Sequence, residues 1–160
     1  MPPSPQPSTL LLPPLPSKKL VQTILVTAFI GFADSAYLTA QHYFALPLPC
    51  SITHGCEKVL TSVYSMVGPI PLAAFGIAFY LFVFFLALDI LTTTQMSLGR
   101  LRLLTIATII GFLMSVIFES MQAFLIHAFC QYCALSALAS TVLAICGVWL
   151  YRTASSSFSK

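Results

Sequence analysis

Residues 130–151 read CQYCALSALASTVLAICGVWLY, and the last eighteen of these residues carry no charge. A helix needs about 20 predominantly apolar residues to cross a hydrocarbon core of about 30 Å. Because lipid offers no partner for backbone N–H and C=O groups, an apolar segment of this length is expected to be helical. We therefore predict a transmembrane helix at 134–151 that begins directly after a Cys-X-X-Cys motif.

Three further apolar segments precede this one. They cover residues 20–44, 70–91 and 102–127, and each contains a single acidic residue, which is Asp34, Asp89 and Glu119 respectively. Each is long enough to span a bilayer as a helix. The predicted fold is an all-α integral membrane protein, a bundle of four transmembrane helices with a large outer loop at 45–69 between the first two.

The composition of the whole chain agrees with this fold class. Of 160 residues, 58% are hydrophobic and 7% are charged, and the mean hydropathy is +0.94. A soluble domain has about a quarter of its residues charged. These values exclude a soluble enzyme, a disordered chain and a cysteine-rich toxin. The net charge of +3 is scattered, so nucleic-acid binding is not expected either.

Basic residues predict how the bundle is oriented. Six of the seven flank the same ends of the predicted helices, and Lys58 alone lies on the other side. Since basic loops stay on the cytoplasmic side, we expect both tails, 1–17 and 153–160, to be cytoplasmic. Seven of the eleven prolines fall in 1–17, so this tail is expected to be disordered. The 45–69 loop and the 128–133 turn would then face the periplasm or its equivalent, outside the inner (plasma) membrane.

Four of the five cysteines fall on that outer side. Cys50 and Cys56 lie in the loop, and Cys130 and Cys133 form the motif before the last helix. Disulfides persist in such an oxidising compartment. The start of a helix also stabilises a thiolate, which makes the cysteine nearer the end nucleophilic. The fifth, Cys146, lies deep in the helix and is expected to be a packing residue.

Two other interpretations of these cysteines stay open. Four cysteines with His54 or His127 could hold a metal, although a C-x5-C pair on a loop fits the usual zinc knuckles poorly. We therefore expect no metal site. The cysteines could also form static disulfides in a non-catalytic membrane protein. A catalytic protein would instead pass electrons from one pair to the other by thiol–disulfide exchange, and a lipid-soluble quinone could accept them.

Specific motifs resemble the bacterial branch of the vitamin K epoxide reductase family over nearly all of residues 20–151. They are GFADSAYL at 31–38, CSITHGCEKVLTS at 50–62, IPLAAFG at 70–76, and CQYC at 130–133. The resemblance implies an integral membrane oxidoreductase that takes electrons from a DsbA-like thioredoxin-fold protein and delivers them to ubiquinone or menaquinone, supporting disulfide formation. Many bacterial members are fused to a thioredoxin domain, whereas here we expect the partner to be a separate protein.

The resemblance also implies roles for individual residues. Cys50 would meet the partner's thiol, Cys56 would pass electrons to Cys130, and Cys133 would react with the quinone. Ser62 matches a family serine near the quinone, and Asp34 and Phe75 are assigned to the same site. Vertebrate members carry a tyrosine and an asparagine where this chain has Ala137 and Leu72, so we expect simple quinone reduction rather than epoxide chemistry.

Polar residues recur at helical spacing inside two of the apolar segments. They are Asp34, Tyr37 and Gln41 in the first helix, and Ser115, Glu119 and Gln122 in the third. Because charged groups are costly in lipid, both stripes are expected to face the bundle interior near the level of the cysteines. Two roles stay open for the acids: they supply hydrogen bonds or protons to the quinone site, or they hold helices together.

Overall fold

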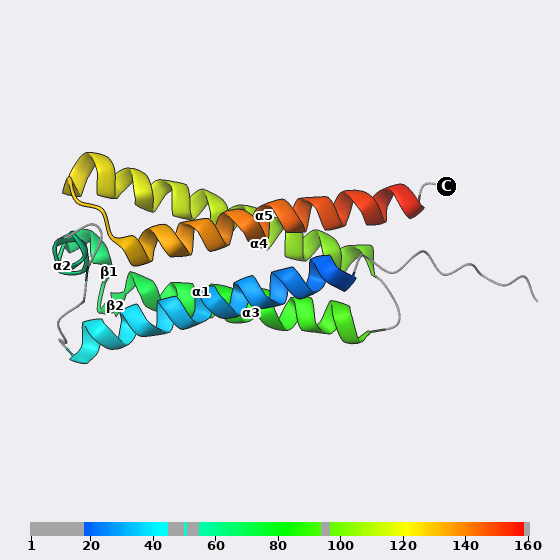
Figure 1. Cartoon of the computed structure of the whole chain (residues 1–160), viewed down its shortest axis with the longest axis horizontal. Helices are drawn as coiled ribbons and strands as arrows, with labels where there is room; N and C mark the ends of the chain where they lie inside the picture. The colour runs from blue at the N-terminus through cyan, green and yellow to red at the C-terminus, as the bar shows by residue number, and fades with distance from the viewer. Residues whose placement is uncertain (1–17, 45–49, 51–54, 94–96, 159–160) are drawn as a thin grey trace, which may run out of the picture.

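The computed structural model describes residues 18–44, 50, 55–93 and 97–158. Its long helices are α1 (Lys18–Phe44), α3 (Leu72–Thr92), α4 (Leu98–Met121) and α5 (Gln131–Phe158). They lie side by side as an elongated bundle (Figure 1), which confirms the predicted all-α four-helix fold. The proline-rich tail 1–17 and His54 lie outside the described residues.

All four long helices are long and apolar enough to cross a membrane, with α4 continued as far as Ile126. Their outward faces carry large exposed apolar side chains, such as Phe29, Phe85, Ile110 and Trp149. Because a soluble protein rarely exposes so much contiguous apolar surface, these faces are the lipid-contacting ones. The chain is a multi-pass membrane protein.

The start of α3 and both ends of α5 differ from the predicted bounds. Strand β2 (Ile70–Pro71) pairs antiparallel with β1 (Met66–Val67) across a turn at Gly68, whose φ is +62°. Residues 70 and 71 therefore form a hairpin, and α3 begins at Leu72 rather than at residue 70. The last helix begins earlier than predicted, at Gln131, and continues to Phe158, so most of the predicted tail 153–160 is helical.

The bundle consists of two tightly packed helix pairs. A Cβ atom placed at Gly31 of α1 would overlap the ring of Tyr80 on α3, and one placed at Gly76 would overlap the Ser35 side chain. These glycines let α1 and α3 approach closely. On the other side, the Thr105 hydroxyl of α4 donates to the Gly147 carbonyl of α5 at 3.0 Å. Helix α1 also packs against α5, and this contact joins the two pairs.

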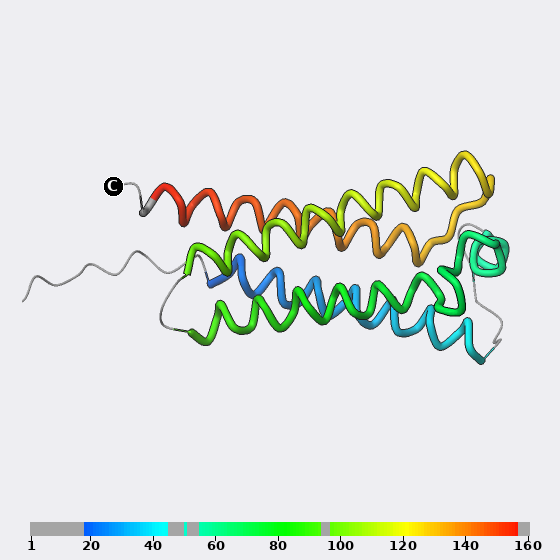
Figure 2. Tube along the Cα trace, turned by 180° about the vertical axis from the view of Figure 1, so that it is seen from behind, coloured from blue at the N-terminus to red at the C-terminus, as the bar shows by residue number. Residues whose placement is uncertain are grey.

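The two ends of the bundle differ. At one end lie the last turn of α1, α2 (Cys56–Leu60), the 3-10 turn η1 (Val63–Ser65), the hairpin, and the π-helical turn η2 (Gln122–Ile126). The start of α1, the end of α3, the start of α4 and the end of α5 lie at the other end, as seen from both sides in Figures 1 and 2. There Asp89 forms an ion pair with Arg100 at 2.9 Å.

Candidate functional site

Four of the five cysteines come together at one end of the bundle. Cys56, Val59 and Cys130 form a buried cluster, and Cys50 and Cys133 pack against it. Cys56 and Cys130 are 74 residues apart in the sequence, yet they lie in one buried cluster. Cys146 lies apart from them, partly buried against the main core of the bundle, as expected for a packing residue.

The loop pair is oxidised. Cys50 and Cys56 form a disulfide with their Cα atoms 6.2 Å apart. Cys56 begins α2 and is 0% exposed, whereas Cys50 is partly exposed. Cys50 is therefore the more exposed residue of this disulfide, and Cys56 is enclosed by protein.

The loop pair is held against the Cys-X-X-Cys motif by a close backbone approach at Gly55. A Cβ atom placed there would lie 2.7 Å from the carbonyl oxygen of Phe129 and 3.0 Å from its nitrogen. Only a residue without a side chain fits such a contact. Since Gly55 precedes Cys56 and Phe129 precedes Cys130, this contact sets the distance between the two cysteine pairs.

The second pair is a dithiol at the start of α5. Cys130 is 1% exposed and Cys133 is partly exposed, and neither is in a disulfide. The hydrogen bond with the Cys133 thiol lowers the pKa of Cys130 from its ordinary value of 9.0 to about 7. Burial raises this pKa, while the backbone N–H groups of Cys133 and Tyr132 lower it further. Cys130 is the cysteine nearer the helix end, so its activation agrees with the helix-start argument.

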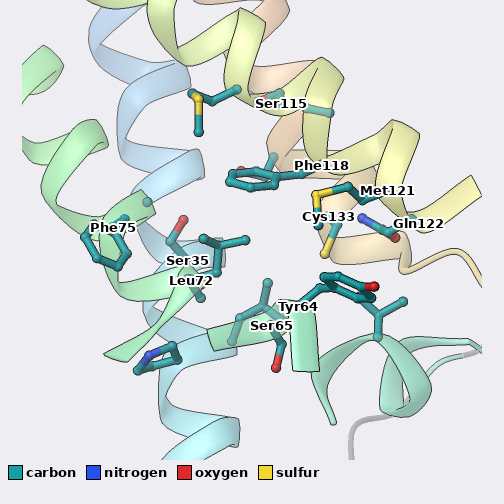
Figure 3. A pocket seen from close by; sticks show the side chains of 18 of the residues that line it. Ser35, Tyr64, Ser65, Leu72, Phe75, Ser115, Phe118, Met121, Gln122 and Cys133 are labelled. Carbon is teal, nitrogen blue, oxygen red and sulfur yellow. The ribbon is translucent and has the colours of Figure 1, made fainter. Parts of the chain in front are cut away.

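A large cavity lies beside the dithiol. It encloses about 600 Å³ and is lined mainly by α3 and α4, with one wall from α2, η1 and the hairpin. Cys133, Ser62 and Phe75 all line it, as do Ala137 and Leu72. Figure 3 shows Cys133 and Phe75 on different walls of this cavity, with Phe118 between their helices. Its volume is that of an ordinary small-molecule site, and its lining is predominantly apolar.

Three of the predicted site residues therefore share the cavity, and Asp34 is not among its lining residues. The Asp34 side chain is 7% exposed, and its Oδ2 atom has no hydrogen-bond partner among the described residues. Its carboxyl interacts electrostatically with Cys130, so it lies near the dithiol. Its predicted role in a quinone site stays a prediction.

The Ser62 hydroxyl is engaged with the backbone. It donates to the Val59 carbonyl at 2.8 Å, just after α2. This bond turns Ser62 into the loop wall of the cavity, where its oxygen still has lone pairs to accept a hydrogen bond. Ser62 thus lines the cavity, and its predicted role in a quinone site stays a prediction.

The polar stripe of α4 divides among three different contacts. Ser115 accepts a hydrogen bond from Ser140 of α5 at 2.7 Å, which joins two helices. Glu119 lines the cavity. Gln122 is 3% exposed, and its Oε1 accepts the backbone N–H of Cys130 at 2.9 Å. Sequence reasoning placed Gln122 in the stripe but missed its contact with the reactive cysteine.

The comparison with family models agrees with this geometry. The model described as "Vitamin K epoxide reductase family" matches residues 22–148, which include the four clustered cysteines and the residues that line the cavity. The chain belongs to the vitamin K epoxide reductase family. A comparison with curated proteins found no match.

Membership of the vitamin K epoxide reductase family indicates a membrane thiol–disulfide oxidoreductase, and the family is linked to quinone redox chemistry in general. The oxidised loop pair beside a reduced Cys-X-X-Cys pair is consistent with that class of reaction. Within the described part of the chain, no three His, Cys, Asp or Glu side chains are grouped so that they could hold a metal ion.

Proposed function

We propose that this protein reoxidises a separate DsbA-like thioredoxin-fold protein and passes the electrons to a membrane quinone, which supports disulfide formation. The observation that carries the proposal is that the four clustered cysteines differ in exposure and in their position relative to the cavity. Cys50 is partly exposed, Cys56 and Cys130 are buried together, and Cys133 lines the cavity. Electrons entering at Cys50 would reach the cavity through two dithiol pairs.

Each step is an ordinary thiol–disulfide exchange. A partner thiolate attacks the Cys50 sulfur, the bond between Cys50 and Cys56 breaks, and Cys56 leaves as a thiolate. The partner's second thiol then releases Cys50 and completes the partner's own disulfide. The loop pair is left as a dithiol that holds two electrons.

The second exchange lies inside the protein. The Cys56 thiolate attacks Cys130 of an oxidised Cys130–Cys133 pair, and Cys133 leaves as a thiolate at the cavity. Cys50 then attacks Cys56, which re-forms the loop disulfide and releases Cys130. The product of this exchange is a loop disulfide beside a free dithiol, which is the arrangement described above.

The lining of the cavity supports a quinone as the electron acceptor. Its lining includes the aromatic side chains of Phe75, Phe79 and Phe118, which suit a flat ring and an isoprenoid chain, and the Ser62 hydroxyl. When bound, a quinone supplies an acceptor for two electrons and two protons. Cys133 would deliver the electrons from the cavity wall, and the neighbouring Cys130 thiolate would close the disulfide. Ubiquinone and menaquinone both have this chemistry.

The distribution of basic residues supports the same route for the electrons. Lys18, Lys19, Arg100 and Arg102 all begin helices at the end opposite the cysteines, near Arg152. By the positive-inside rule that end is cytoplasmic, and the cysteine end faces the periplasm or its equivalent, where a dithiol oxidant operates. Labelling of Cys50, after mild reduction, by a thiol reagent that cannot cross the membrane would test this. Labelling only from the cytoplasmic side would overturn the orientation.

Reaction of the purified protein with a reduced thioredoxin-fold partner and a soluble quinone tests the function directly. We expect the quinone absorbance to fall at a rate that the Cys133→Ala variant loses and that Cys146→Ala retains. If the wild-type protein reduces no quinone, or if Cys133→Ala reduces it at an unchanged rate, the alternative of a non-catalytic membrane protein with structural disulfides is favoured.

A further inference from the structure

The connection between α4 and α5 is built around one residue, Gln122. Helix α4 ends in the π-helical turn η2, and His127 then adopts a left-handed conformation with φ of 50° and ψ of 44°. The Gln122 main-chain carbonyl accepts the Ala128 N–H at 3.2 Å, and its side-chain Oε1 accepts the Cys130 N–H at 2.9 Å. A non-glycine residue in this conformation persists where its surroundings hold it, and both of these bonds come from Gln122.

The bond to Cys130 is made at the position where α5 begins. The Cys130 carbonyl accepts the N–H of Ala134 at 3.0 Å, which is the first bond of the helix, so Cys130 is the N-cap residue. An N-cap side chain accepts hydrogen bonds from the N–H groups of the first turn. Here that acceptor is a sulfur, and the N–H groups belong to Tyr132 and Cys133.

The N-cap geometry requires that the Cys130 backbone be held outside the helix, with its own N–H turned away from it. That N–H is buried, so it needs an acceptor that water cannot supply. Gln122 is 3% exposed and supplies it from the neighbouring helix. Figure 3 shows the Gln122 side chain, at the start of η2, on the same side of the cavity as Cys133.

We infer that Gln122 is a positioning residue for the redox centre: its carboxamide holds Cys130 as the N-cap of α5, so that the Cys130 sulfur stays within reach of the N–H groups that stabilise its thiolate. This inference rests on the proposed role of Cys130 as the thiol that exchanges with the loop pair. It adds a residue outside the cysteines that sets how reactive that thiol is. Gln122 acts through Cys130.

The test measures the Cys130 thiolate in protein that contains neither quinone nor partner. The parent is the Cys146→Ala variant, with the loop disulfide intact and the Cys130–Cys133 pair reduced. The ultraviolet absorbance of the thiolate is followed against pH, because this signal does not require a reagent to reach a buried sulfur. The parent is expected to titrate with a midpoint near pH 7.

Gln122→Met keeps the length of the side chain and removes the amide acceptor, and Gln122→Asn keeps the amide but is too short to reach Cys130. We expect both to raise the midpoint by about one pH unit, which lowers the thiolate fraction at pH 6 about tenfold. Gln41→Met is the matched control. Gln41 is also a buried glutamine at this end of the bundle, and it makes no hydrogen bond to Cys130 or Cys133 among the described residues.

A midpoint near pH 7 in either folded Gln122 variant, or an equal rise in Gln41→Met, would overturn the inference. Two replacements of different shape are used so that a failure of one to fold leaves the other to decide. The measurement does not depend on electron transfer. A protein that reduces no quinone would refute the proposed function and still report on Gln122, and a failure of the inference would leave quinone reduction by the wild type unaffected.

Discussion

Replacement of Gly55 by alanine tests whether the two cysteine pairs exchange electrons through the contact described above. The new Cβ atom would lie 2.7 Å from the Phe129 carbonyl oxygen, 3.0 Å from the Phe129 nitrogen and 3.1 Å from the Ala128 Cβ. Gly55 has φ of −104° and ψ of −4°, a conformation that alanine also adopts. The substitution therefore adds a clash without adding backbone strain.

The size of the effect follows from how far the chains must separate. Non-bonded heavy atoms are stable at about 3.5–4.0 Å, so the two segments must move apart by roughly 1 Å. Gly55 and Phe129 each precede a reacting cysteine, so this movement is transmitted to Cys56 and Cys130. A misplacement of about 1 Å at a reacting centre can slow a reaction about 100-fold. We expect internal exchange in Gly55→Ala to be about 10- to 100-fold slower than in the parent.

The assay follows internal exchange alone. Protein with a reduced loop pair and an oxidised Cys130–Cys133 pair is acid-quenched over time, alkylated with a bulky maleimide, and mapped for the position of the disulfide. The control is Gly99→Ala at the opposite end, where the added Cβ would lie 3.4 Å from the Ser97 hydroxyl and needs little adjustment. If Gly55→Ala moves its disulfide at the parent rate, contact between the pairs at this position does not govern exchange, and the proposed route through Cys56 and Cys130 loses its support.

Three further predictions follow from the same structure. Because the pKa of Cys130 is about 7, its thiolate absorbance should rise about tenfold per pH unit well below pH 7 and level off above it. Cys133→Ala removes the hydrogen bond that lowers this pKa most, so the midpoint should move up toward 9.0, and an unmoved midpoint would contradict the assignment. Gly31→Ala places a methyl group into the Tyr80 ring and should lower the free energy of unfolding by about 1–3 kcal/mol, measured by denaturation in detergent; an unchanged stability would mean that the α1–α3 contact is looser than described. Cys146→Ala should leave the rate of internal exchange within twofold of wild type, and a larger loss in the same mapping assay would show that this thiol joins the relay.

The four helices could be predicted because lipid imposes a length and a hydrogen-bonding rule that a sequence displays directly. Helix ends could not be predicted as well. The start of α3 moved to Leu72 because Ile70 and Pro71 pair with Met66 and Val67, and a two-residue hairpin leaves no clear periodicity. The last helix begins at Gln131 because Cys130 serves as its N-cap, a role that cysteine propensity does not indicate.

The cysteine pairs and their common side could be predicted from spacing and from the basic residues, since both depend on local sequence. The contact that each polar residue makes could not be predicted from the sequence. Ser115, Glu119 and Gln122 share a helical stripe, yet they contact α5, the cavity and the Cys130 backbone respectively. The stripe places these residues on one face, but their contacts depend on which element lies opposite each turn. The π-helical turn that begins at Gln122 and the left-handed His127 that follows it leave no mark in a helical periodicity.

The arrangement of the chain ends in the bundle has a practical consequence. Helix α5 has 28 residues and is therefore about 42 Å long, so Phe158 lies that far from Cys130, and Lys18 lies at the same distant end. An affinity tag, a fluorescent reporter or a surface linkage attached beside either residue would lie at the opposite end of the bundle from the cysteines. Protein immobilised in this way would present its cysteine end uniformly to the solution, which suits single-molecule and electrode measurements of its thiol chemistry.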